Sequence, residues 1–380
     1  MNRITLKGKL SDYGYHPWIF RDRIKGVENN RICAQVYVNG KFLGSAFYNP
    51  EGNLALRFYS REKEEFNAGL VYKRILESIS FREDILGFKS AYRLFFAESD
   101  NMPGIIADVY GKGVVIQISS YGAEKLKGEI VEGFKMAGYE FLYEKSDNYA
   151  RRQEGLEPFE GFHFGGARDV IVEINGLNMI VPIGGQKTGL YLDQRLNWEI
   201  VGRIMRGRDR VLDAFSYTGG FTLHLLKNGV KRVLAVDEDD EALEILKQNC
   251  KINNLKGAET LTGNVFDMLD TFILSNDEFD GIILDPPAFA KGKNISGALK
   301  GYTRLIDRAL RLVKKGGILA VFSCSHYIDY AHLEDVISRV SKKLLREVKI
   351  LFRLYQSPDH PVPIYFKDSE YLRGLVCLVY

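Results

Sequence analysis

Cysteine is scarce in this chain, and long apolar segments are missing from it. The four cysteines, Cys33, Cys250, Cys324 and Cys377, show neither CxxC nor Cys/His metal-ligand spacing, which argues against a disulfide framework and a zinc site. No apolar run is long enough to span a bilayer, and the N-terminal residues lack the apolar stretch of a signal peptide. We therefore expect reduced thiols, no metal, no membrane partner and a cytoplasmic location.

A strong excess of either charge is also absent. The chain of 380 residues carries 52 Lys/Arg and 49 Asp/Glu, and its formal net charge of +3 indicates nothing about nucleic acid by itself. Residues 1–70 hold eleven basic and seven acidic side chains, a local net charge of +4. This modest bias is compatible with phosphate contacts, although a solvated surface of mixed charge would fit equally well.

The sequence changes in character twice along its length. Residues 1–67 are short β-like runs broken by Gly, Pro and Asn, with a hairpin signal at Asn39–Gly40, and predict a small β-barrel domain. Residues 68–185 mix amphipathic helices with strands, end in a hairpin at Asn175–Gly176, and predict an α+β middle domain. The third domain, residues 186–380, begins within a glycine-rich stretch.

The third domain alternates strands and helices. No strong helix precedes its last strand-like run, which suits a final strand that enters antiparallel. The pattern therefore predicts an α/β fold, a mostly parallel seven-stranded sheet covered by helices with the last strand antiparallel, and ligands at the carboxyl ends of the strands. The strand-like runs are 210–215, 232–237, 258–263, 279–285, 316–323, 346–354 and 374–380.

A loop of small residues follows the first of these strands. It reads DAFSYTGGF over residues 213–221, and its two glycines let the backbone approach a ligand closely. The GxGxxG pattern that binds a pyrophosphate at a helix N-terminus is absent, which disfavours a nicotinamide-dependent oxidoreductase. The acidic Asp213 would repel a pyrophosphate but can order a network around the ammonium group of S-adenosylmethionine.

Polar residues also end the second and third strands. Asp237 can accept hydrogen bonds from both ribose hydroxyls, although an aspartate at this place is often only a helix cap. Asn264 is placed either to read the edge of an adenine or to cap the next helix, and the sequence does not decide between the two. Together with Asp213, these residues predict a pocket for the adenosyl group of S-adenosylmethionine.

Asp285 and Cys324 end the fourth and fifth strands. Two prolines stiffen the backbone after Asp285, which suits either a carboxylate that holds a planar base or merely a rigid turn. A lone cysteine is more often a small buried apolar residue, as we expect for the other three, but Cys324 ends a strand at the predicted cleft. A thiolate there can add to carbon 6 of cytosine and make carbon 5 nucleophilic towards a sulfonium methyl.

These motifs resemble those of the class I ribosomal RNA large-subunit (cytosine-C5) methyltransferases, a family with an N-terminal PUA domain. The resemblance covers nearly the whole chain and rests on DAFSYTGGF, LDPPAF, FSCS, QKTGLYLDQR, HPWIFRDRI, EKSDNYARRQEGLE and SPDHPVP. It implies a Rossmann-like methyltransferase domain preceded by a PUA-like β-barrel and an α+β domain. It also implies methyl transfer from S-adenosylmethionine to carbon 5 of a cytosine in 23S ribosomal RNA.

The resemblance implies roles for single residues. Cys324 matches the nucleophile and Asp285 the acid that holds the base. Many RNA cytosine-C5 enzymes carry a second cysteine after the two prolines, but Ala288 stands there, which leaves the base that removes the C5 proton open between His326, His360 and other groups. The expected cofactor-binding residues are Gln194, Arg195, Asp213, Phe215, Ser216, Tyr217, Thr218, Gly219, Asp237, Asn264 and Asp285.

Other functions stay open on the sequence alone. A methyltransferase acting on a nitrogen such as guanine N7 shares the Asp-Pro-Pro turn but needs no thiol, so the role of Cys324 separates it from a cytosine-C5 enzyme. A protein that binds S-adenosylmethionine and RNA without catalysis is a second alternative. The sequence also leaves the oligomeric state open, a homodimer included.

Overall fold

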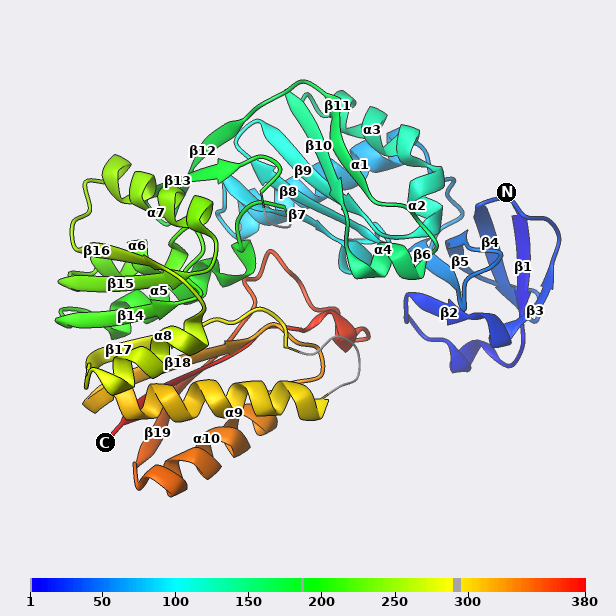
Figure 1. Ribbon diagram of the computed structural model, residues 1–380. Coiled ribbons are helices and arrows are strands. Elements are labelled where there is room, and N and C mark those ends of the chain that lie inside the picture. Colours follow the sequence, from blue (N-terminus) through cyan, green and yellow to red (C-terminus); the bar gives the residue numbers. More distant parts are fainter. Residues whose placement is uncertain (1, 186–187, 290–294) are drawn as a thin grey trace. The chain divides into compact units, whose positions relative to one another are not determined.

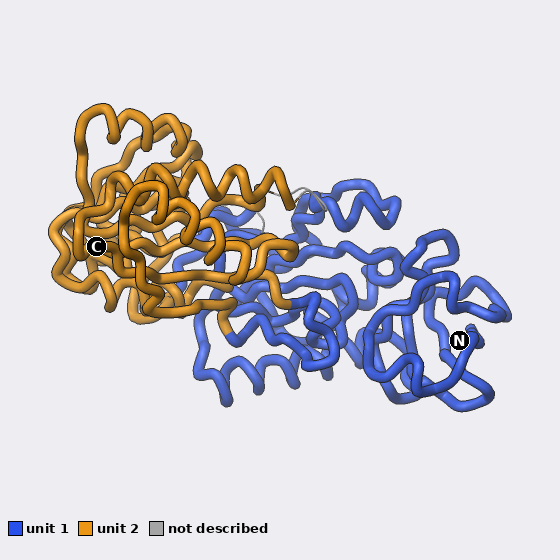
Figure 2. Tube along the Cα trace, turned by 90° about the horizontal axis from the view of Figure 1, so that it is seen from below, with its two compact units in different colours: residues 1–172, 181–192, 358–369 blue, residues 173–180, 193–357, 370–380 orange. Residues whose placement is uncertain are grey.

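The computed structural model describes residues 2–185, 188–289 and 295–380. The chain divides into two compact units (Figure 2). Unit 1 comprises residues 1–172, 181–192 and 358–369, and unit 2 comprises residues 173–180, 193–357 and 370–380. The predicted boundary at 185–186 touches residues 186–187, which lie outside the described ranges, and the division into three domains stays a prediction.

Six strands form the N-terminal sheet of unit 1, which is curled (Figure 1). They lie in the order β2-β6-β5-β4-β1-β3 and pair antiparallel, except for the parallel pair β1–β4. The hairpin predicted at Asn39–Gly40 is confirmed, because these residues join β4 to β5 with φ of 48° and 78°. The elements are β1 (Asn2–Leu6), η1 (Leu10–Asp12), β2 (Trp18–Phe20), η2 (Arg21–Arg23), β3 (Ile24–Val27), β4 (Cys33–Val38), β5 (Lys41–Tyr48) and β6 (Leu54–Ser60).

A second sheet of unit 1 has five strands in the order β11-β10-β9-β8-β7. Helices α1 and α3 pack together, and the side chain of Asn67 caps α1 by accepting a hydrogen bond from the amide of Leu70. A π-helix, η3, follows α1 directly. The elements are α1 (Ala68–Ile79), η3 (Ser80–Ile85), β7 (Ala91–Phe96), η4 (Ala97–Asp100), β8 (Ile105–Tyr110), β9 (Gly113–Ile118), α2 (Tyr121–Lys125), α3 (Lys127–Met136), β10 (Phe141–Ser146), α4 (Tyr149–Gln153) and β11 (Phe159–Phe164).

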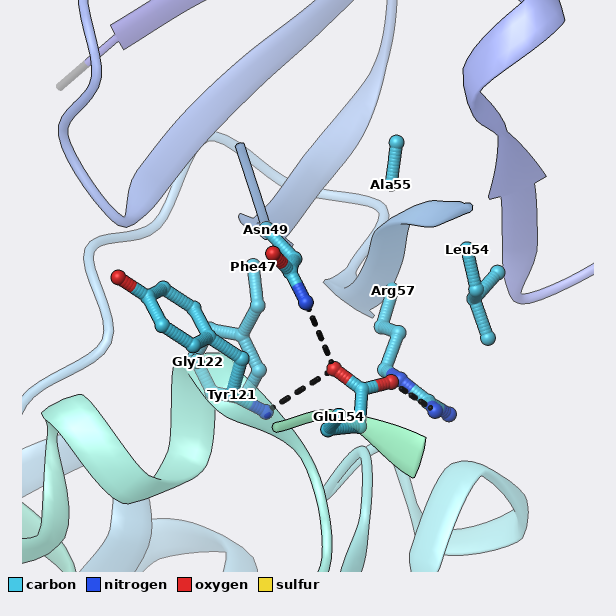
Figure 3. Close-up of a pocket in the computed structure, with 8 residues that line it drawn as sticks. All are labelled: Phe47, Asn49, Leu54, Ala55, Arg57, Tyr121, Gly122 and Glu154. Atoms are coloured by element: carbon cyan, nitrogen blue, oxygen red, sulfur yellow. Dashed lines mark hydrogen bonds and ion pairs between the residues drawn. The ribbon is translucent and has the colours of Figure 1, made fainter. Parts of the chain in front are cut away.

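An ionic cluster around Glu154 connects the N-terminal sheet to α2, η4 and the end of α4 (Figure 3). The Glu154 carboxylate accepts hydrogen bonds from Asn49 Nδ2 at 2.9 Å, Arg57 Nη2 at 2.7 Å and the amide of Tyr121 at 3.3 Å. Arg57 also pairs with Glu98. The cavity beside this cluster measures about 10 Å³, room for one water molecule at most, so it is no ligand site.

A two-stranded hairpin follows, formed by β12 (Asp169–Ile174) and β13 (Leu177–Pro182). Its turn at Asn175–Gly176 has φ of 53° and 72°, which confirms the second predicted hairpin. The side-chain nitrogen Nδ2 of Asn175 donates a hydrogen bond to the carbonyl oxygen of Arg195 at 2.7 Å.

The main sheet of unit 2 has seven strands in the order β16-β15-β14-β17-β18-β20-β19. The first five strands of this order, β16, β15, β14, β17 and β18, are parallel to one another. Strand β20 pairs antiparallel with both of its neighbours, β18 and β19. The predicted α/β sheet with an antiparallel last strand is therefore confirmed. Its strands are β14 (Arg210–Ala214), β15 (Arg232–Asp237), β16 (Ala258–Thr262), β17 (Phe279–Leu284), β18 (Val313–Ser323), β19 (Val348–Tyr355) and β20 (Arg373–Val379).

Helices cover both faces of this sheet (Figure 1). Buried side chains of α8, α9 and α10 share one hydrophobic core with strands β14, β17, β18 and β20. Within the described ranges, no helix is long and apolar enough to cross a membrane. The helices of unit 2 and the short turns near it in sequence are η5 (Leu192–Gln194), α5 (Arg195–Ile204), α6 (Gly220–Lys227), α7 (Asp240–Ile252), α8 (Val265–Leu274), α9 (Ile295–Leu312), α10 (Tyr330–Leu344) and η6 (Lys367–Ser369).

Candidate active site

The loop between β14 and α6 has a strained backbone that is held in place by the neighbouring strand. Phe215, Tyr217 and Gly219 have φ of 66°, 48° and 92°, and two of them are not glycine. The amides of Phe215 and Ser216 both donate to the carbonyl oxygen of Val236, at 2.8 and 3.1 Å. Strained backbone persists only where its surroundings enforce it, so this loop has one fixed shape at the carboxyl end of the sheet.

Glycine is required at position 219 on two grounds. Its φ of 92° is unfavourable for any other residue, and an added Cβ would lie 2.6 Å from Cγ of Leu246. The neighbouring Thr218 is buried, and its carbonyl oxygen accepts a hydrogen bond from Asn249 Nδ2 at 3.0 Å. Gly219 therefore allows close packing of the loop backbone against α7.

Asp213 is completely buried at the end of β14. Its Oδ2 accepts hydrogen bonds from the amide and the hydroxyl of Thr222, at 3.0 and 2.6 Å. Burial raises the pKa of Asp213 from 3.8 to about 6, against the opposing effect of these two hydrogen bonds. The carboxylate is thus ionised at neutral pH but stays poorly solvated, an environment that favours a cationic ligand.

Asp237 shapes the same loop from the end of β15. Its Oδ2 accepts a hydrogen bond from the amide of Tyr217 at 2.8 Å, and its Oδ1 accepts one from the amide of Asp239 at 3.0 Å. Each oxygen retains a lone pair for a further donor. The carboxylate can therefore hold the loop and accept ribose hydroxyls at the same time.

Asn264 acts as a helix cap. Its Oδ1 accepts a hydrogen bond from the amide of Phe266 at 3.0 Å at the start of α8, and its Nδ2 donates to Glu238. Of the two roles weighed from the sequence, the capping role is present in the structure, and the contact with adenine stays a prediction.

Gln194 and Asp285 are brought together within unit 2. Gln194 is buried, and its Nε2 donates to Asp285 Oδ2 at 3.0 Å, while its Oε1 accepts from Asn197 Nδ2 at 2.6 Å. The amide of Asp285 lies 3.4 Å from the carbonyl oxygen of Ala214, which belongs to β14. Gln194 thus orients the Asp285 carboxylate. Arg195, the next residue in the sequence and the first of α5, is also buried.

Cys324 lies immediately after β18, with a half-buried side chain. Its thiol contacts the carbonyl oxygen of Pro286, with Sγ and O 3.9 Å apart. The structure therefore brings the thiol to the Asp-Pro-Pro turn, as the strand-end argument predicts. The other three cysteines are buried, and burial raises the pKa of each thiol. The pKa of Cys250 rises to about 11 and that of Cys377 to about 12, so their thiolates are disfavoured.

Tyr302 is a residue of the site that the sequence did not reveal. It lies on α9 and is fully buried, and its hydroxyl makes no hydrogen bond of normal geometry within the described residues. Burial raises its pKa, and Ser323, Cys324 and Asp285 are the groups that act on its charge. At neutral pH it is therefore a protonated phenol, a donor and not a base. Tyrosine in an amphipathic helix reads as ordinary core, so no sequence signal distinguished it.

The two histidines considered as bases differ in location. His360 belongs to unit 1, where it is buried against Phe96 and Asp359. This packing favours a structural role for His360. His326 follows Cys324 by two positions, is exposed, and its ring lies 5.8 Å from that of Tyr371.

The residues of the loop fit S-adenosylmethionine. Among the described residues, two buried oxygen atoms of this region lack a hydrogen-bond partner, Asp213 Oδ1 and Ser216 Oγ. Leaving such atoms unpaired is costly, and a ligand with ammonium and carboxylate groups supplies partners for both. Within the same described ranges, no group of three or more His, Cys, Asp or Glu side chains is arranged to hold a metal ion.

Comparisons with known proteins identify the family. A model of S-adenosylmethionine-dependent methyltransferases matches residues 159–362, and a model of PUA-like domains matches residues 13–61. Ribosomal RNA large subunit methyltransferase I of Vibrio vulnificus is 38% identical over 379 residues, which cover 96% of this chain and 95% of the relative. The chain belongs to this methyltransferase family. Its cofactor is S-adenosylmethionine, as the strand-end residues predict.

Other relatives and solved structures agree with this assignment. The enzyme of the same name from Pseudoalteromonas atlantica is 37% identical over 377 residues, again covering 96% of this chain and 95% of the relative. A crystal structure described as a methyltransferase complexed with S-adenosylhomocysteine superposes over 100% of both chains, with a TM-score of 0.84 and 21% identity. A structure from Streptococcus mutans has a TM-score of 0.82 at 21% identity. These two structures support the fold of the whole chain, including its N-terminal PUA-like sheet.

Proposed function

We propose that this methyltransferase modifies large-subunit ribosomal RNA at carbon 5 of a cytosine, through a covalent bond between Cys324 and the base. The substrate class follows from the relatives, whose names state large-subunit ribosomal RNA. The target atom rests on one observation, the contact between the Cys324 thiol and the turn that carries Asp285. A nitrogen methyltransferase needs no thiol at that position, because a ring nitrogen has its own lone pair.

The surroundings of Asp285 suit a residue that holds a base. Gln194 fixes one carboxylate oxygen, and the two prolines restrict the backbone that follows. A carboxyl group held in this way meets the N3 edge of a cytosine that has been turned out of its stack. Its orientation is then set before the base arrives, which reduces the entropic cost of reaching the reactive geometry.

The chemistry of the proposal runs through Cys324 and Asp285, with the cofactor loop beside them. The Cys324 thiolate adds to C6 of the cytosine, and the negative charge that develops towards N3 is neutralised by a proton shared with Asp285. S-Adenosylmethionine supplies an electrophilic methyl group to C5. The loop held by Asp237, together with the buried Asp213 carboxylate, would bind the cofactor beside the base. C5 then loses its proton to a base, the C5–C6 double bond re-forms, and the C6–Sγ bond breaks to release the thiolate.

Nucleoside mass mapping of modified RNA tests this proposal. Large-subunit ribosomal RNA made by transcription is incubated with S-adenosylmethionine and the wild-type protein, Cys324→Ala or Cys250→Ala. We expect 5-methylcytidine from the wild type and from Cys250→Ala, whose cysteine is buried in α7, and none from Cys324→Ala. Affinity of Cys324→Ala for S-adenosylhomocysteine should be unchanged. A methylated nitrogen, or an active Cys324→Ala variant, would overturn the proposed target atom.

A further inference from the structure

The connection between β19 and β20 carries a segment that packs in unit 1. Residues 358–369 belong to unit 1, whereas the strands on either side belong to the sheet of unit 2 (Figure 2). At the start of the segment, the carbonyl oxygen of Asp359 accepts a hydrogen bond from Arg82 Nη2 at 2.9 Å, and its carboxylate accepts one from the amide of Arg93 at 2.9 Å. The segment is thus fixed to the five-stranded sheet of unit 1.

Its other end is fixed to the PUA-like sheet by Phe366. This ring is buried, lies 4.8 Å from that of Trp18 in an edge-to-face contact, and lies 5.6 Å from that of His16. Aromatic pairs of this geometry contribute stability beyond their buried area. Because Phe366 is anchored, the residue before it has a defined place on the surface of the PUA-like sheet.

That residue, Tyr365, forms an exposed aromatic pair with Tyr15. The two ring centroids are 5.7 Å apart with an angle of 36° between the planes. Tyr15 is 64% exposed and Tyr365 46%, and the adjacent Ile364 is 89% exposed. Two large rings that meet in solvent bury little of their surface, and such clusters mark binding sites more often than single exposed rings do.

A cation without an acidic partner lies beside this pair. The Arg61 guanidinium lies 5.5 Å from the ring of Tyr15 and 4.3 Å from that of Phe58. Its hydrogen bonds go to the carbonyl oxygens of His16 at 3.1 Å and Leu43 at 3.5 Å, and no described carboxylate lies within ion-pair distance of it.

Other buried arginines of the same unit differ from Arg61. Each of them binds a carboxylate directly, which compensates the cost of burying its charge. These arginines are Arg82, Arg93 and Arg151, and the half-buried Arg57 likewise binds carboxylates. Arg61 is half-buried, and its guanidinium donates only to carbonyl oxygens among the described residues. Its positive charge is therefore available to an anion that comes from outside the chain.

We propose that Tyr15, Tyr365 and Arg61 form a platform that binds an unpaired stretch of the substrate RNA. Bases stack on the two rings, and the guanidinium contacts a phosphate of the same strand. The proposal rests on an RNA substrate and makes the C-terminal segment 358–369 part of the RNA-binding surface. RNA is favoured over a protein because single-stranded RNA presents both base π-faces and phosphates. The exposed tyrosines can stack on the bases, and the arginine without a carboxylate partner can bind a phosphate.

Fluorescence anisotropy with labelled RNA tests the platform on the full-length protein. The probes are a single-stranded oligouridylate of about twelve nucleotides and a fully paired duplex of the same length. The variants are Tyr15→Ala, Tyr365→Ala, Tyr365→Phe and Arg61→Gln. Tyr149→Ala is the matched control, because Tyr149 is a 72% exposed tyrosine of the same unit whose ring contacts no other ring among the described residues. Circular dichroism and urea unfolding that match the wild type verify that each variant is folded.

We expect Tyr15→Ala and Tyr365→Ala to weaken single-strand binding by roughly five- to hundredfold, the range measured for the loss of one base–aromatic stack. Tyr365→Phe and Tyr149→Ala should stay within about twofold of the wild type, since phenylalanine keeps the stacking face. Arg61→Gln should lower the slope of log affinity against log salt by about one unit. Duplex binding should change much less than single-strand binding in the tyrosine variants.

Wild-type affinity in both tyrosine-to-alanine variants would overturn the platform. So would self-association of the wild type that is lost in Tyr365→Ala while RNA binding is kept, because the patch would then bind a second copy of the chain. The outcome is separate from that of the methylation assay. If the tyrosine variants bind RNA more weakly and the wild-type product is methylated on nitrogen, the platform stands and the cytosine proposal is overturned. If these variants bind RNA normally and the wild-type product is 5-methylcytidine, the cytosine proposal stands and the platform is overturned.

Discussion

Replacing Asp213 with asparagine should remove a pH dependence that we expect in cofactor binding. Asp213 is fully buried with a pKa raised from 3.8 to about 6, and its Oδ1 has no partner among the described residues. We expect the cofactor's ammonium group to face this carboxylate. Binding of a cation then favours the ionised form and returns the pKa towards its usual value.

The size of the effect follows from that pKa shift. If binding restores the pKa of Asp213 from about 6 to 3.8, the protein must release a proton on binding at pH 5 but almost none at pH 7. The dissociation constant should therefore be about tenfold larger at pH 5 than at pH 7. His224, whose pKa burial lowers to about 4, stays neutral over this range and contributes little.

The same shift predicts the stability of the cofactor-free protein. The folded form keeps the Asp213 proton up to about pH 6, whereas the unfolded chain loses it near pH 4. The stabilising contribution is complete below pH 4 and is lost as the pH rises to about 6. Asp213 alone should therefore lower the free energy of unfolding by about 3 kcal/mol over this interval, and this amount should appear as the difference between the wild type and Asp213→Asn.

Titration calorimetry with S-adenosylhomocysteine between pH 5 and 7 measures the binding effect. Asparagine retains an oxygen for the two hydrogen bonds of Thr222, so Asp213→Asn removes the charge with little change in packing. Asp209→Asn is the control, because Asp209 is an exposed carboxylate of the same unit. A pH-independent affinity in the wild type, or an equal pH dependence in Asp213→Asn, would refute the reasoning.

Three further variants test the packing around the site and in unit 1. Gly219→Ala should lose about 1–3 kcal/mol more stability than Gly207→Ala in urea unfolding. Both positions have positive φ, but only a Cβ at position 219 would lie 2.6 Å from a side-chain atom, Cγ of Leu246. Equal losses in the two variants would contradict this. Asp237→Ala should weaken S-adenosylhomocysteine binding by about 1–3 kcal/mol, and an unchanged calorimetric affinity would remove it from the site. Arg57→Ala should lower the free energy of unfolding by about 3–5 kcal/mol because two buried carboxylates lose their partner, and a loss below 1 kcal/mol would contradict this.

The ionic cluster around Arg57 also affects how the PUA-like sheet should be tested. Deleting residues 1–67 would remove Arg57 and leave Glu98 and Glu154 buried without it. Such a truncated chain loses stability for reasons unrelated to RNA. The surface variants at Tyr15 and Tyr365 avoid this problem, because both side chains are exposed.

Local signals in the sequence predicted the main sheet well. Most of its strands are apolar runs that end at a polar residue or a turn, and the alternation with amphipathic helices left few other topologies. The hairpins at Asn39–Gly40 and Asn175–Gly176 were predictable because asparagine and glycine tolerate positive φ. The strand-end positions of Asp213, Asp237, Asp285 and Cys324 followed from the same pattern.

Long-range packing was not predictable in this way. Nothing in residues 358–369 indicates that they pack in unit 1, since the segment is neighboured in sequence by two strands of unit 2. Single strands between residues 68 and 164 could not be placed reliably, because short apolar runs in a mixed segment fit helix and strand alike. Gln194 is a partner of Asp285, which lies about 90 positions away in the sequence. Tyr302 is a buried donor whose neighbours in the site lie about 20 positions away. No local sequence pattern connects residues at these separations.

Covalent trapping with 5-fluorocytidine tests the Cys324 mechanism most directly. Large-subunit ribosomal RNA containing this nucleoside is incubated with the protein and S-adenosylmethionine, and the modified peptide is located by mass spectrometry. Fluorine cannot leave C5 as a proton does, so elimination of the thiolate is blocked. We predict a stable RNA–protein adduct on the peptide that contains Cys324, retained in Cys250→Ala and absent from Cys324→Ala. Methylated RNA without any adduct, or an adduct on another residue, would contradict the mechanism.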